Sequence, residues 1–257
     1  MTALAFVFCA ITAHALPSFD EVRRGHRPSE SLLLDRHGEV LHRLRTDPAV
    51  RRGAWVALDD VSPALRSAIV LSEDKRFWQH SGVDWQAASA AAWANLWNQR
   101  TRGASTLTMQ LAGLLDGDWA QRPGGRGVAA KLGQTVAAQV LDRRWRKDQI
   151  LEAYLNLVPL RGEIVGIDAL SRSLFGKAAH GLDARESALA VALLRAPNAG
   201  ATQVARRACG VLHAVEPAAS CALLAAFTEA ALQTRAWEAS EGIAPHLARR
   251  LLAAPGT

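Results

Sequence analysis

The stretch SEDKRFWQHSGVD, residues 72–84, follows an apolar segment that begins with Val61-Ser62-Pro63. Ser and Pro suit the N-cap and the first position of a helix, so residues 61–72 are predicted to be helical. Glu73 then lies where an apolar helix gives way to a loop. A carboxylate at such a place can be partly desolvated, which suits it for acid–base catalysis. A Glu-Asp pair at a helix end is more commonly a solvated terminus, so this stretch alone establishes no catalysis.

Two further polar stretches follow along the chain. GASTLTMQ, residues 103–110, places Gly before Ser and Thr at a predicted helix start, where free backbone N–H groups can bind an anion. The simpler interpretation of this stretch is a Ser N-cap. AKLGQ at residues 130–134 and WRKDQILEAYLN at residues 145–156 are typical of helices with one charged face.

Composition favours a helical protein. The chain has 257 residues, of which 49% are hydrophobic and 6% aromatic, and its mean hydropathy is +0.01. These values exclude a disordered chain, a collagen-like chain and a polytopic membrane protein, and they disfavour an all-β sandwich. The net charge of +6 suits an anionic partner such as lipid headgroups or a phosphorylated substrate. Nucleic acid is the weakest of these partners because no zinc finger or RNA-binding signature occurs, and no His/Cys cluster resembles a metal site.

Periodicity and turn residues predict the order of the elements. Residues 31–45 are expected to form two short strands around the turn signal Asp35-Arg36-His37-Gly38. Residues 116–127 are rich in Gly, Asp and Pro and are expected to form an exposed, mobile loop in which Trp119 contacts the membrane interface or a lipid chain. The last residues, 201–257, are expected to form an Ala-rich helical tail. Helices are predicted at residues 61–72, 84–99, 106–115, 128–144, 147–155, 167–174 and 184–195.

The chain start has three readings. Residues 2–17 are mostly apolar, but as a helix they would span about 22 Å, less than the roughly 30 Å of a bilayer core. They fit a signal-peptide core, a truncated membrane anchor or a buried helix of the globular domain. Either export reading implies an oxidising compartment. Cys209 and Cys221 are then expected to form a disulfide across a helical hairpin that turns near Pro217.

Taken together, the motifs carry a family resemblance. The order ED-x-x-F-x-x-H-x-G-x-D, G-x-S-T-x-T-x-Q and I-L-E-x-Y-L-N resembles glycosyltransferase family 51, the peptidoglycan glycosyltransferase domain of class A penicillin-binding proteins and their monofunctional relatives. The resemblance covers about residues 30–200. The segment DRHGEVLHRLR at residues 35–45 and the second motif look most like the penicillin-binding protein 1C type. Further matches are Gly162, Gly166-Ile167, Phe175-Gly176-Lys177, and Glu186 leading to Ala196-Pro197.

The resemblance implies a mainly α fold with a lysozyme-like helical globular lobe, a small mobile membrane-adjacent lobe and a short N-terminal β-hairpin. It implies polymerisation of lipid II into β-1,4 glycan strands by inverting transfer, with release of polyprenyl diphosphate. Glu73 matches the general base that removes the acceptor proton. The positions that match substrate-binding residues are Asp74, Phe77, His80, Gly103, Ser105, Thr106, Thr108, Gln110, Arg126, Lys131 and Gln134.

The chain departs from the family pattern at two places. The R-K-x-x-E motif reads Ala130-Lys131-Leu132-Gly133-Gln134, and Gly113 stands where many relatives carry Lys. The family requires no cofactor, and a divalent metal (Mg²⁺ or Mn²⁺) bound through the substrate diphosphate is disfavoured because Gln134 holds no charge. Glu152, Tyr154 and Asn156 are predicted to be structural, with Glu152 binding Tyr154 or a backbone amide.

The expected partners are lipid II, the nascent glycan strand, the cytoplasmic membrane and transpeptidases or other cell-wall proteins, with the catalytic domain on the periplasmic or outer face of the membrane. The predicted organisation is an apolar signal or anchor segment at 1–18, the glycosyltransferase domain at 19–200 and a helical tail at 201–257. Two alternatives stay open. One is a non-catalytic or weakly active lipid II-binding scaffold, and the other is a lysozyme-like hydrolase, which needs one Glu as acid and a route for water.

Overall fold

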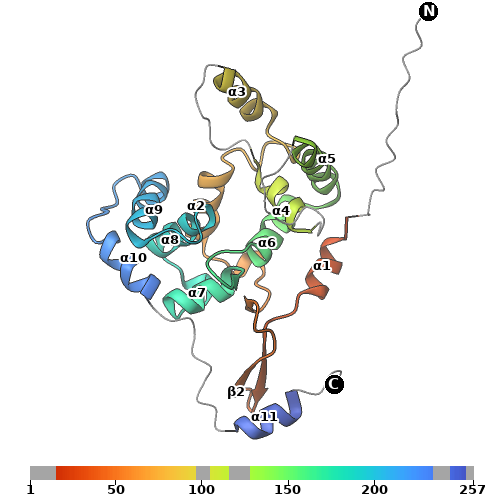
Figure 1. Ribbon diagram of the computed structural model, residues 1–257, viewed down its shortest axis with the longest axis vertical. Helices are drawn as coiled ribbons and strands as arrows, with labels where there is room; N and C mark the ends of the chain where they lie inside the picture. Colours follow the sequence, from red (N-terminus) through yellow and green to blue (C-terminus); the bar gives the residue numbers. More distant parts are fainter. Residues whose placement is uncertain (1–15, 97–104, 116–127, 234–243, 253–257) are drawn as a thin grey trace, which may run out of the picture.

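The computed structural model of the chain describes residues 16–96, 105–115, 128–233 and 244–252. Helices make up most of these residues, so the predicted mainly helical fold is confirmed (Figure 1). The elements in chain order are α1 (Phe19–Gly25), β1 (Glu30–Leu34), β2 (Val40–Arg45), β3 (Arg51–Arg52), η1 (Leu58–Asp60), α2 (Pro63–Glu73), α3 (Trp85–Leu96), α4 (Leu107–Leu115), α5 (Val128–Arg144), α6 (Lys147–Leu157), β4 (Ile164–Val165), α7 (Ile167–Phe175), η3 (Ala179–Gly181), α8 (Ala184–Arg195), α9 (Ala201–Val215), α10 (Leu224–Gln233) and α11 (Pro245–Leu252).

Helix α6 lies near the centre of the molecule, and α4, α7 and α1 pack against it (Figure 1). Helices α8, α9 and α10 form a second group, and α2 packs against α8 and α9. The side chains of α2, α6 and α8 that face one another are buried in one continuous apolar core, which includes Ile69, Leu151 and Leu189. Burial of this core is the main stabilising term and fixes the position of the C-terminal end of α2, where Glu73 lies.

The helices and the hairpin predicted from periodicity are present. Each of the seven predicted helices begins within two residues of its expected start, and β1 pairs with β2 as an antiparallel hairpin around the expected turn. The predicted helical tail contains α9, α10 and α11, with residues 234–243 and 253–257 outside the described residues. The loop at 116–127, with Trp119, and the end of the 84–99 helix also lie outside them.

Among the α-helices and strands, one short helix and one pair of strands were not predicted. Helix α1 has 7 residues and is held by a capping box in which Ser18 accepts from the backbone N–H of Glu21. Strands β3 and β4 have two residues each and pair in parallel, Arg51 with Ile164 and Arg52 with Val165. A seven-residue helix is too short for a clear hydrophobic period, and a two-residue strand has none. Both elements depend on contacts between distant parts of the chain.

The start of α2 differs from the prediction in one detail. Ser62 stands at the N-cap position before Pro63, as expected, but its side chain makes no cap hydrogen bond with the helix. Instead its hydroxyl donates to the carbonyl oxygen of Leu182 at 2.7 Å. Ser62 is buried, so the hydroxyl needs a partner, and it finds one in the segment that precedes α8. The residue therefore joins α2 to α8.

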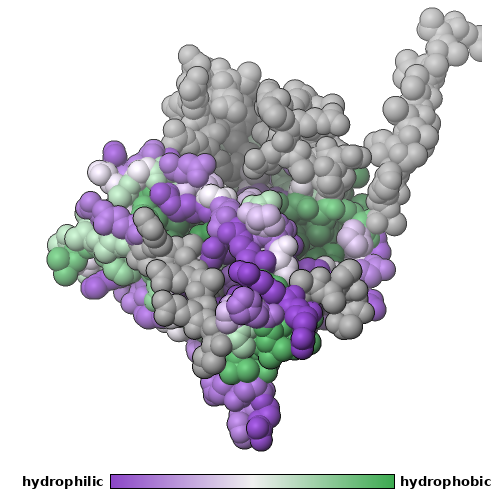
Figure 2. All heavy atoms as spheres, turned by 60° about the horizontal axis from the view of Figure 1, so that its bottom comes forward, coloured by the Kyte–Doolittle hydropathy of each residue, from purple (hydrophilic) through white to green (hydrophobic). Residues whose placement is uncertain are grey.

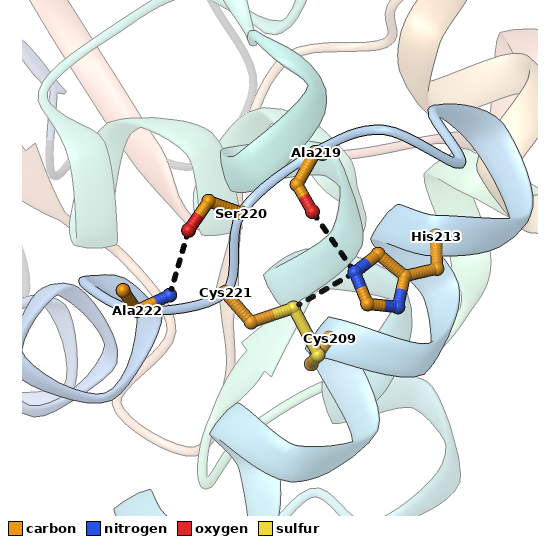
Figure 3. Close-up of a disulfide and its surroundings, with 6 residues drawn as sticks. All are labelled: Cys209, His213, Ala219, Ser220, Cys221 and Ala222. Atoms are coloured by element: carbon orange, nitrogen blue, oxygen red, sulfur yellow. Dashed lines mark hydrogen bonds between the residues drawn. A yellow bond between two sulfur atoms is a disulfide. The ribbon is translucent and has the colours of Figure 1, made fainter.

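The predicted disulfide between Cys209 and Cys221 is present (Figure 3). It links α9 to the segment before α10 across a Cα–Cα distance of 5.6 Å. Nε2 of His213, one turn after Cys209, lies 2.9 Å from the carbonyl oxygen of Ala219 and 3.5 Å from Cys221 Sγ. The carbonyl oxygen can only accept, so Nε2 carries the proton in this contact. The disulfide and this imidazole together close the loop between the two helices.

The apolar chain start falls at residues 1–15, outside the described part of the chain, and its three readings stay open. None of the helices that the structure describes combines the length and the hydropathy that a membrane span needs. On the face turned forward in Figure 2, hydrophilic residues occupy much of the described surface and hydrophobic residues form smaller areas between them. Exposed leucines of the hairpin and α11, such as Leu34 and Leu251, contribute apolar surface where α11 lies against the hairpin.

Candidate active site

A cavity of about 500 Å³ lies at the C-terminal end of α2. The described residues that line it come from the end of α2, the loop that follows, α3, the N-terminal end of α4 and the last residue of α8. They are Ser72, Glu73, Asp74, Lys75, Arg76, Asp84, Ala87, Ser105, Thr106 and Arg195. The structure therefore brings together the first two motifs, which are about 30 residues apart in the sequence. Their meeting point has both carboxylates and cations.

Glu73 ends α2 and its side chain is only 10% exposed. Its Oε1 accepts a hydrogen bond from Nε of Arg195 at 2.6 Å. Within the part of the chain that the structure describes, its Oε2 has one long contact, at 3.5 Å, with Nε2 of Gln110 on α4. One carboxylate oxygen is thus engaged by a cation and the other has a weak donor. The second oxygen is the one that is available to accept a proton from a bound molecule.

A second chain of hydrogen bonds approaches Glu73 from the core. The hydroxyl of Tyr154 on α6 donates to Oε1 of Gln110 at 2.7 Å. Tyr154 is almost completely buried, and burial, together with the negative charge of Glu73, raises the pKa of its hydroxyl far above the usual range. Tyr154 therefore stays protonated and donates. Because Gln110 Oε1 accepts from Tyr154, the amide is oriented with its Nε2 toward Glu73.

Asp74 has a different role from its neighbour Glu73. Both of its carboxylate oxygens lie 2.9 Å from Nε2 of His80, and one of them accepts from the backbone N–H of Leu107 at 3.0 Å. Leu107 begins α4, so Asp74 satisfies one of the free N–H groups at that helix end and complements the helix dipole there. Asp74 is 6% exposed. It holds the segment after α2 against α4, and through it the first motif sets the position of the second.

Thr106 and Gly82 provide a second connection between the segment after α2 and the start of α4. The Thr106 hydroxyl donates to the Gly82 carbonyl at 2.6 Å and accepts from the backbone N–H of Met109, so Thr106 caps α4. Gly82 has φ +82°, and a Cβ there would overlap the carbonyl of Ala138 on α5. The glycine of the first motif is therefore required by its backbone conformation and by the close approach of α5. Ser105, the residue before Thr106, lines the cavity.

Arg76 and Asp84 form an ion pair at the cavity wall. Asp84 accepts from Nε of Arg76 at 2.9 Å and also from a terminal guanidinium nitrogen. It accepts as well from the backbone N–H of Ala87 at 2.7 Å, at the start of α3. Burial acts to raise the pKa of Asp84, but the Arg76 hydrogen bond and the Ala87 N–H outweigh it, and the pKa is lowered. Lys75, between these groups and Glu73, has no ion pair within 4 Å among the described residues.

Five of the predicted substrate-binding residues that the structure describes do not line the cavity: Phe77, His80, Thr108, Gln110 and Gln134. Phe77 and Thr108 are 0% exposed and lie in the interior behind its wall. The imidazole of His80 is 8% exposed and points its Nε2 at Asp74. For Phe77, Thr108 and His80, a direct substrate contact stays a prediction, and in this structure the three side chains are buried. Apolar packing and the hydrogen bonds of the Asp74 junction place these side chains in the core, where they hold the motif in shape.

The segment that corresponds to R-K-x-x-E, residues 130–134, lies on α5, which packs against α4. Gln134 is 4% exposed and is not part of the cavity lining. Its Nε2 would lie 2.7 Å from a Cβ placed on Gly113. Two of the three departures from the family pattern, Gly113 and Gln134, therefore lie next to each other, and the third is Ala130. Lys131 belongs to α5, but its side chain is not among the described parts of the structure. Arg126 and Gly103 also lie outside the described residues.

The I-L-E-x-Y-L-N motif lies on α6, and two of its polar side chains bind the segment before η1. Glu152 accepts from the indole N–H of Trp55 at 2.7 Å and from the backbone N–H of Leu58 at 2.9 Å. The predicted contact of Glu152 with a backbone amide is confirmed. The Tyr154 hydroxyl is hydrogen-bonded to Gln110 and not to Glu152. Asn156 accepts from the N–H of Val56 and donates to its carbonyl, both at 2.8 Å. These two side chains fix the segment before η1 on α6.

Groups that could hold a metal are limited in the described part of the chain. Cys209, His213 and Cys221 bring their sulfur and nitrogen atoms within 4.8 Å of one another. The two sulfurs are bonded to each other, so they are not thiolate ligands. In the cavity, Asp74 and Asp84 are already engaged by His80 and Arg76.

Arg195 was not identified from the sequence. It is the last residue of α8, at the position before Ala196-Pro197, and it contacts Glu73 across 122 residues of chain. A basic residue in the last turn of a helix is commonly explained by the helix dipole alone. No local pattern distinguishes such a residue from one that reaches into a cavity.

Comparison with known proteins agrees with the motifs. Residues 37–216 match the family model described as "Transglycosylase". The match covers well over half of the chain, and the chain belongs to this family. The family is glycosyltransferase family 51, so the prediction from the motifs is confirmed.

Among curated relatives, the "Biosynthetic peptidoglycan transglycosylase" of Rhodospirillum centenum is 42% identical over 147 residues, which are 56% of this chain and 60% of that protein. "Penicillin-binding protein 1C" of Escherichia coli is 37% identical over 150 residues, 57% of this chain and 19% of that protein. "Penicillin-binding protein 1A" of Rickettsia prowazekii is 29% identical over 208 residues, 76% of this chain and 25% of that protein. The match thus spans about three fifths of the first of these relatives and a quarter or less of the other two.

Proposed function

We propose that this chain is a peptidoglycan glycosyltransferase that polymerises lipid II, with Glu73 as the general base. The observation that carries the proposal is the state of the Glu73 carboxylate. It is 10% exposed, it lines a cavity, and among the described residues its Oε2 has a single contact, at 3.5 Å. The family match and the relatives named as peptidoglycan transglycosylases support the substrate class.

The chemistry follows from this geometry. A sugar hydroxyl is a weak nucleophile at neutral pH, so Glu73 Oε2 takes the proton of the acceptor 4-hydroxyl while the new C1–O bond forms. The bond from the donor anomeric carbon to diphosphate breaks, and the configuration inverts to a β-1,4 link. Polyprenyl diphosphate leaves as an anion and needs positive charge rather than an acid. Lys75 is the described lining cation without an ion pair within 4 Å, and we assign it to the substrate diphosphate.

The outer face of the cytoplasmic membrane is the proposed location. Trp85, Val136 and Val140 are 61%, 57% and 40% exposed. Trp85 belongs to α3, and Val136 and Val140 belong to α5. The segment before α3 meets α5 where Gly82 lies against Ala138. Exposed Trp and apolar side chains next to a cavity suit contact with the interfacial region of a bilayer. We propose that α3 and α5 form the membrane-adjacent part of the protein and α6 the centre of the globular part.

A second function is favoured by one observation. Gly113 and Gln134 leave the α4–α5 contact without the charges that many relatives carry there. A protein that binds lipid II without turnover, as a scaffold for transpeptidases or other cell-wall proteins, fits a site weakened in this way. Gln134 also offers no charge for a divalent metal, so we propose that the reaction needs none.

Labelled lipid II tests these alternatives. The wild-type chain is expected to form glycan polymer, and Glu73→Gln is expected to lower the rate by about 10²–10⁴-fold while lipid II still binds. Glu39→Gln is the matched control because Glu39 is an exposed carboxylate in the hairpin turn. Binding without polymer in the wild type would support the scaffold. Cleavage of finished glycan would support a hydrolase.

A further inference from the structure

The guanidinium of Arg195 holds the end of α2 at two points. Its Nε donates to Oε1 of Glu73 at 2.6 Å, and a terminal nitrogen donates to the backbone carbonyl of Ser72. Ser72 is in the last turn of α2, where carbonyl oxygens have no partner within the helix. One side chain from the end of α8 therefore binds both the backbone that carries Glu73 and the Glu73 carboxylate.

Stability alone does not explain this contact. The Arg195 side chain is 47% exposed and Glu73 is 10% exposed, so water screens the ion pair from the Arg195 side and reduces its contribution to folding stability. The packing of α2 on α8 already fixes the two helices through buried residues such as Ile69 and Leu189. The contact instead restricts the one part of Glu73 that the core cannot restrict, which is the rotation of its carboxylate.

The two carboxylate oxygens of Glu73 are made unequal by their neighbours. Oε1 carries the charge-assisted bond from Arg195 and a 3.4 Å contact with the Ser72 hydroxyl. Oε2 faces Gln110, whose amide is oriented by Tyr154. Hydrogen bonds to charged groups are strong and directional. Arg195 therefore determines which oxygen is held and which is left for the acceptor.

We propose that Arg195 is a positioning residue for the Glu73 base, an inference that rests on the proposed function. It clamps Oε1 so that Oε2 points at the acceptor hydroxyl, and it stays in place during the reaction. Moving it to the substrate diphosphate would leave Glu73, at 10% exposure, and the Ser72 carbonyl without their cation. Leaving a buried charge unpaired is unfavourable, so the geometry favours a fixed clamp over a mobile latch.

Steady-state kinetics of Arg195→Ala tests the clamp. A misplaced base lowers the chemical step, so kcat is expected to fall by about 10–100-fold, with the KM for lipid II within about twofold. Guanidinium ion added to Arg195→Ala is expected to restore part of kcat. The kcat of Arg195→Lys is expected to lie between those of the wild type and Arg195→Ala. One ammonium cannot bind both the Glu73 Oε1 and the Ser72 carbonyl oxygen as the guanidinium does. Arg185→Ala is the matched control, since Arg185 is exposed at the other end of α8.

Three outcomes would overturn the clamp. A raised KM with unchanged kcat would make Arg195 a substrate ligand, a raised kcat would make it an inhibitory latch, and equal loss in Arg195→Ala and Arg185→Ala would make the effect nonspecific. A structure of Arg195→Ala gives a readout that needs no turnover, and an unmoved Glu73 carboxylate there would also reject the clamp. A wild-type chain without polymer, or a fully active Glu73→Gln variant, would reject the proposed function instead.

Discussion

The two ends of helix α4 use charge in opposite ways. At its N-terminal end, the α2–α4 corner (Glu73, Asp74 and Gln110 with their partners), each carboxylate is buried and has a specific donor. Further along α4, the α4–α5 contact joins Gly113 to the neutral amide of Gln134. The chain has kept charge where the structure provides a counter-charge or N–H groups. Neither residue at the α4–α5 contact carries a charge, and because Gly113 and Gln134 are neighbours we expect these two departures from the family pattern to be coupled.

The largest expected effect is at the corner. Asp74→Ala removes the acceptor of His80 Nε2 and of the Leu107 N–H, and it leaves both donors buried. Each buried group without a partner costs about 1–3 kcal/mol, so we expect the free energy of unfolding in urea to fall by about 3 kcal/mol. Asp59→Ala is the control because the Asp59 side chain is fully exposed, at 103%. Similar losses in the two variants would show that the corner is no more than a solvated helix end.

The α4–α5 contact is expected to show a smaller effect that depends on pH. Gln134→Glu places a carboxylate at a position that is 4% exposed and faces a glycine. Burial disfavours the ionised form, so we expect a loss of about 1–3 kcal/mol at pH 8. The loss should shrink as the pH falls, because the protonated carboxyl resembles the native amide. Urea denaturation of this variant at several pH values measures both effects.

The second substitution at this contact distinguishes a coupled pair from two independent changes. Gly113→Lys supplies the missing cation, although the Gln134 amide must turn away from the new Cβ. In the double variant we expect a coupling free energy of about 1–2 kcal/mol, typical of contacting residues. The polymerisation rate should rise in the double variant and not in Gln134→Glu alone. If the changes in the free energy of unfolding of the two single variants add up to that of the double variant, positions 113 and 134 are energetically independent. The α4–α5 contact would then not be a coupled pair.

Tyr154→Phe is expected to have a still smaller effect on stability. The substitution removes one hydrogen bond, from the Tyr154 hydroxyl to Gln110 Oε1, and leaves the ring in the core. The expected loss in the free energy of unfolding is about 1 kcal/mol. Because the Gln110 amide is then free to turn over, the polymerisation rate should fall by more than this loss implies. An unchanged rate at reduced stability would limit Tyr154 to a structural role.

The corner and the α4–α5 contact also differ in how far the sequence predicted them. Glu73 and its place after an apolar helix follow from local pattern, and the helix starts follow from caps and periodicity. The division of labour between Glu73 and Asp74 does not, because both are acids at a helix end and only the contact with Leu107 separates them. Phe77 and His80 share the motif with Glu73 but face the core. A motif predicts which residues act together and does not predict which of them face the substrate.

Contacts between distant segments could not be predicted from pattern at all. Arg195 reaches Glu73 because α8 packs on α2, and the contact of Gly113 with Gln134 depends on how α4 and α5 pack. Both are set by the burial of apolar faces, which has no direction of its own. The disulfide was the exception, since Cys209 and Cys221 are near in sequence and flank a turn. Sequence distance, rather than chemical type, determined what was missed.

The smallest expected effect is the pH dependence of the Arg76–Asp84 pair, which borders the corner on the cavity side. The pKa of Asp84 is lowered in the folded state, so the pair stabilises the fold at pH values above the ordinary aspartate pKa of about 3.9. That contribution is lost as the pH falls through the lowered value, because Asp84 is then protonated in both states. The difference in the free energy of unfolding between the wild type and Asp84→Asn should be constant from about pH 7 to 5 and should shrink below about pH 4. Asp59→Asn should show no such difference, because Asp59 is fully exposed. If the Asp84→Asn difference instead grew on acidification, the Arg76–Asp84 ion pair would destabilise the fold. The contrast between the α2–α4 corner, where charges have partners, and the uncharged α4–α5 contact would then not extend to the cavity.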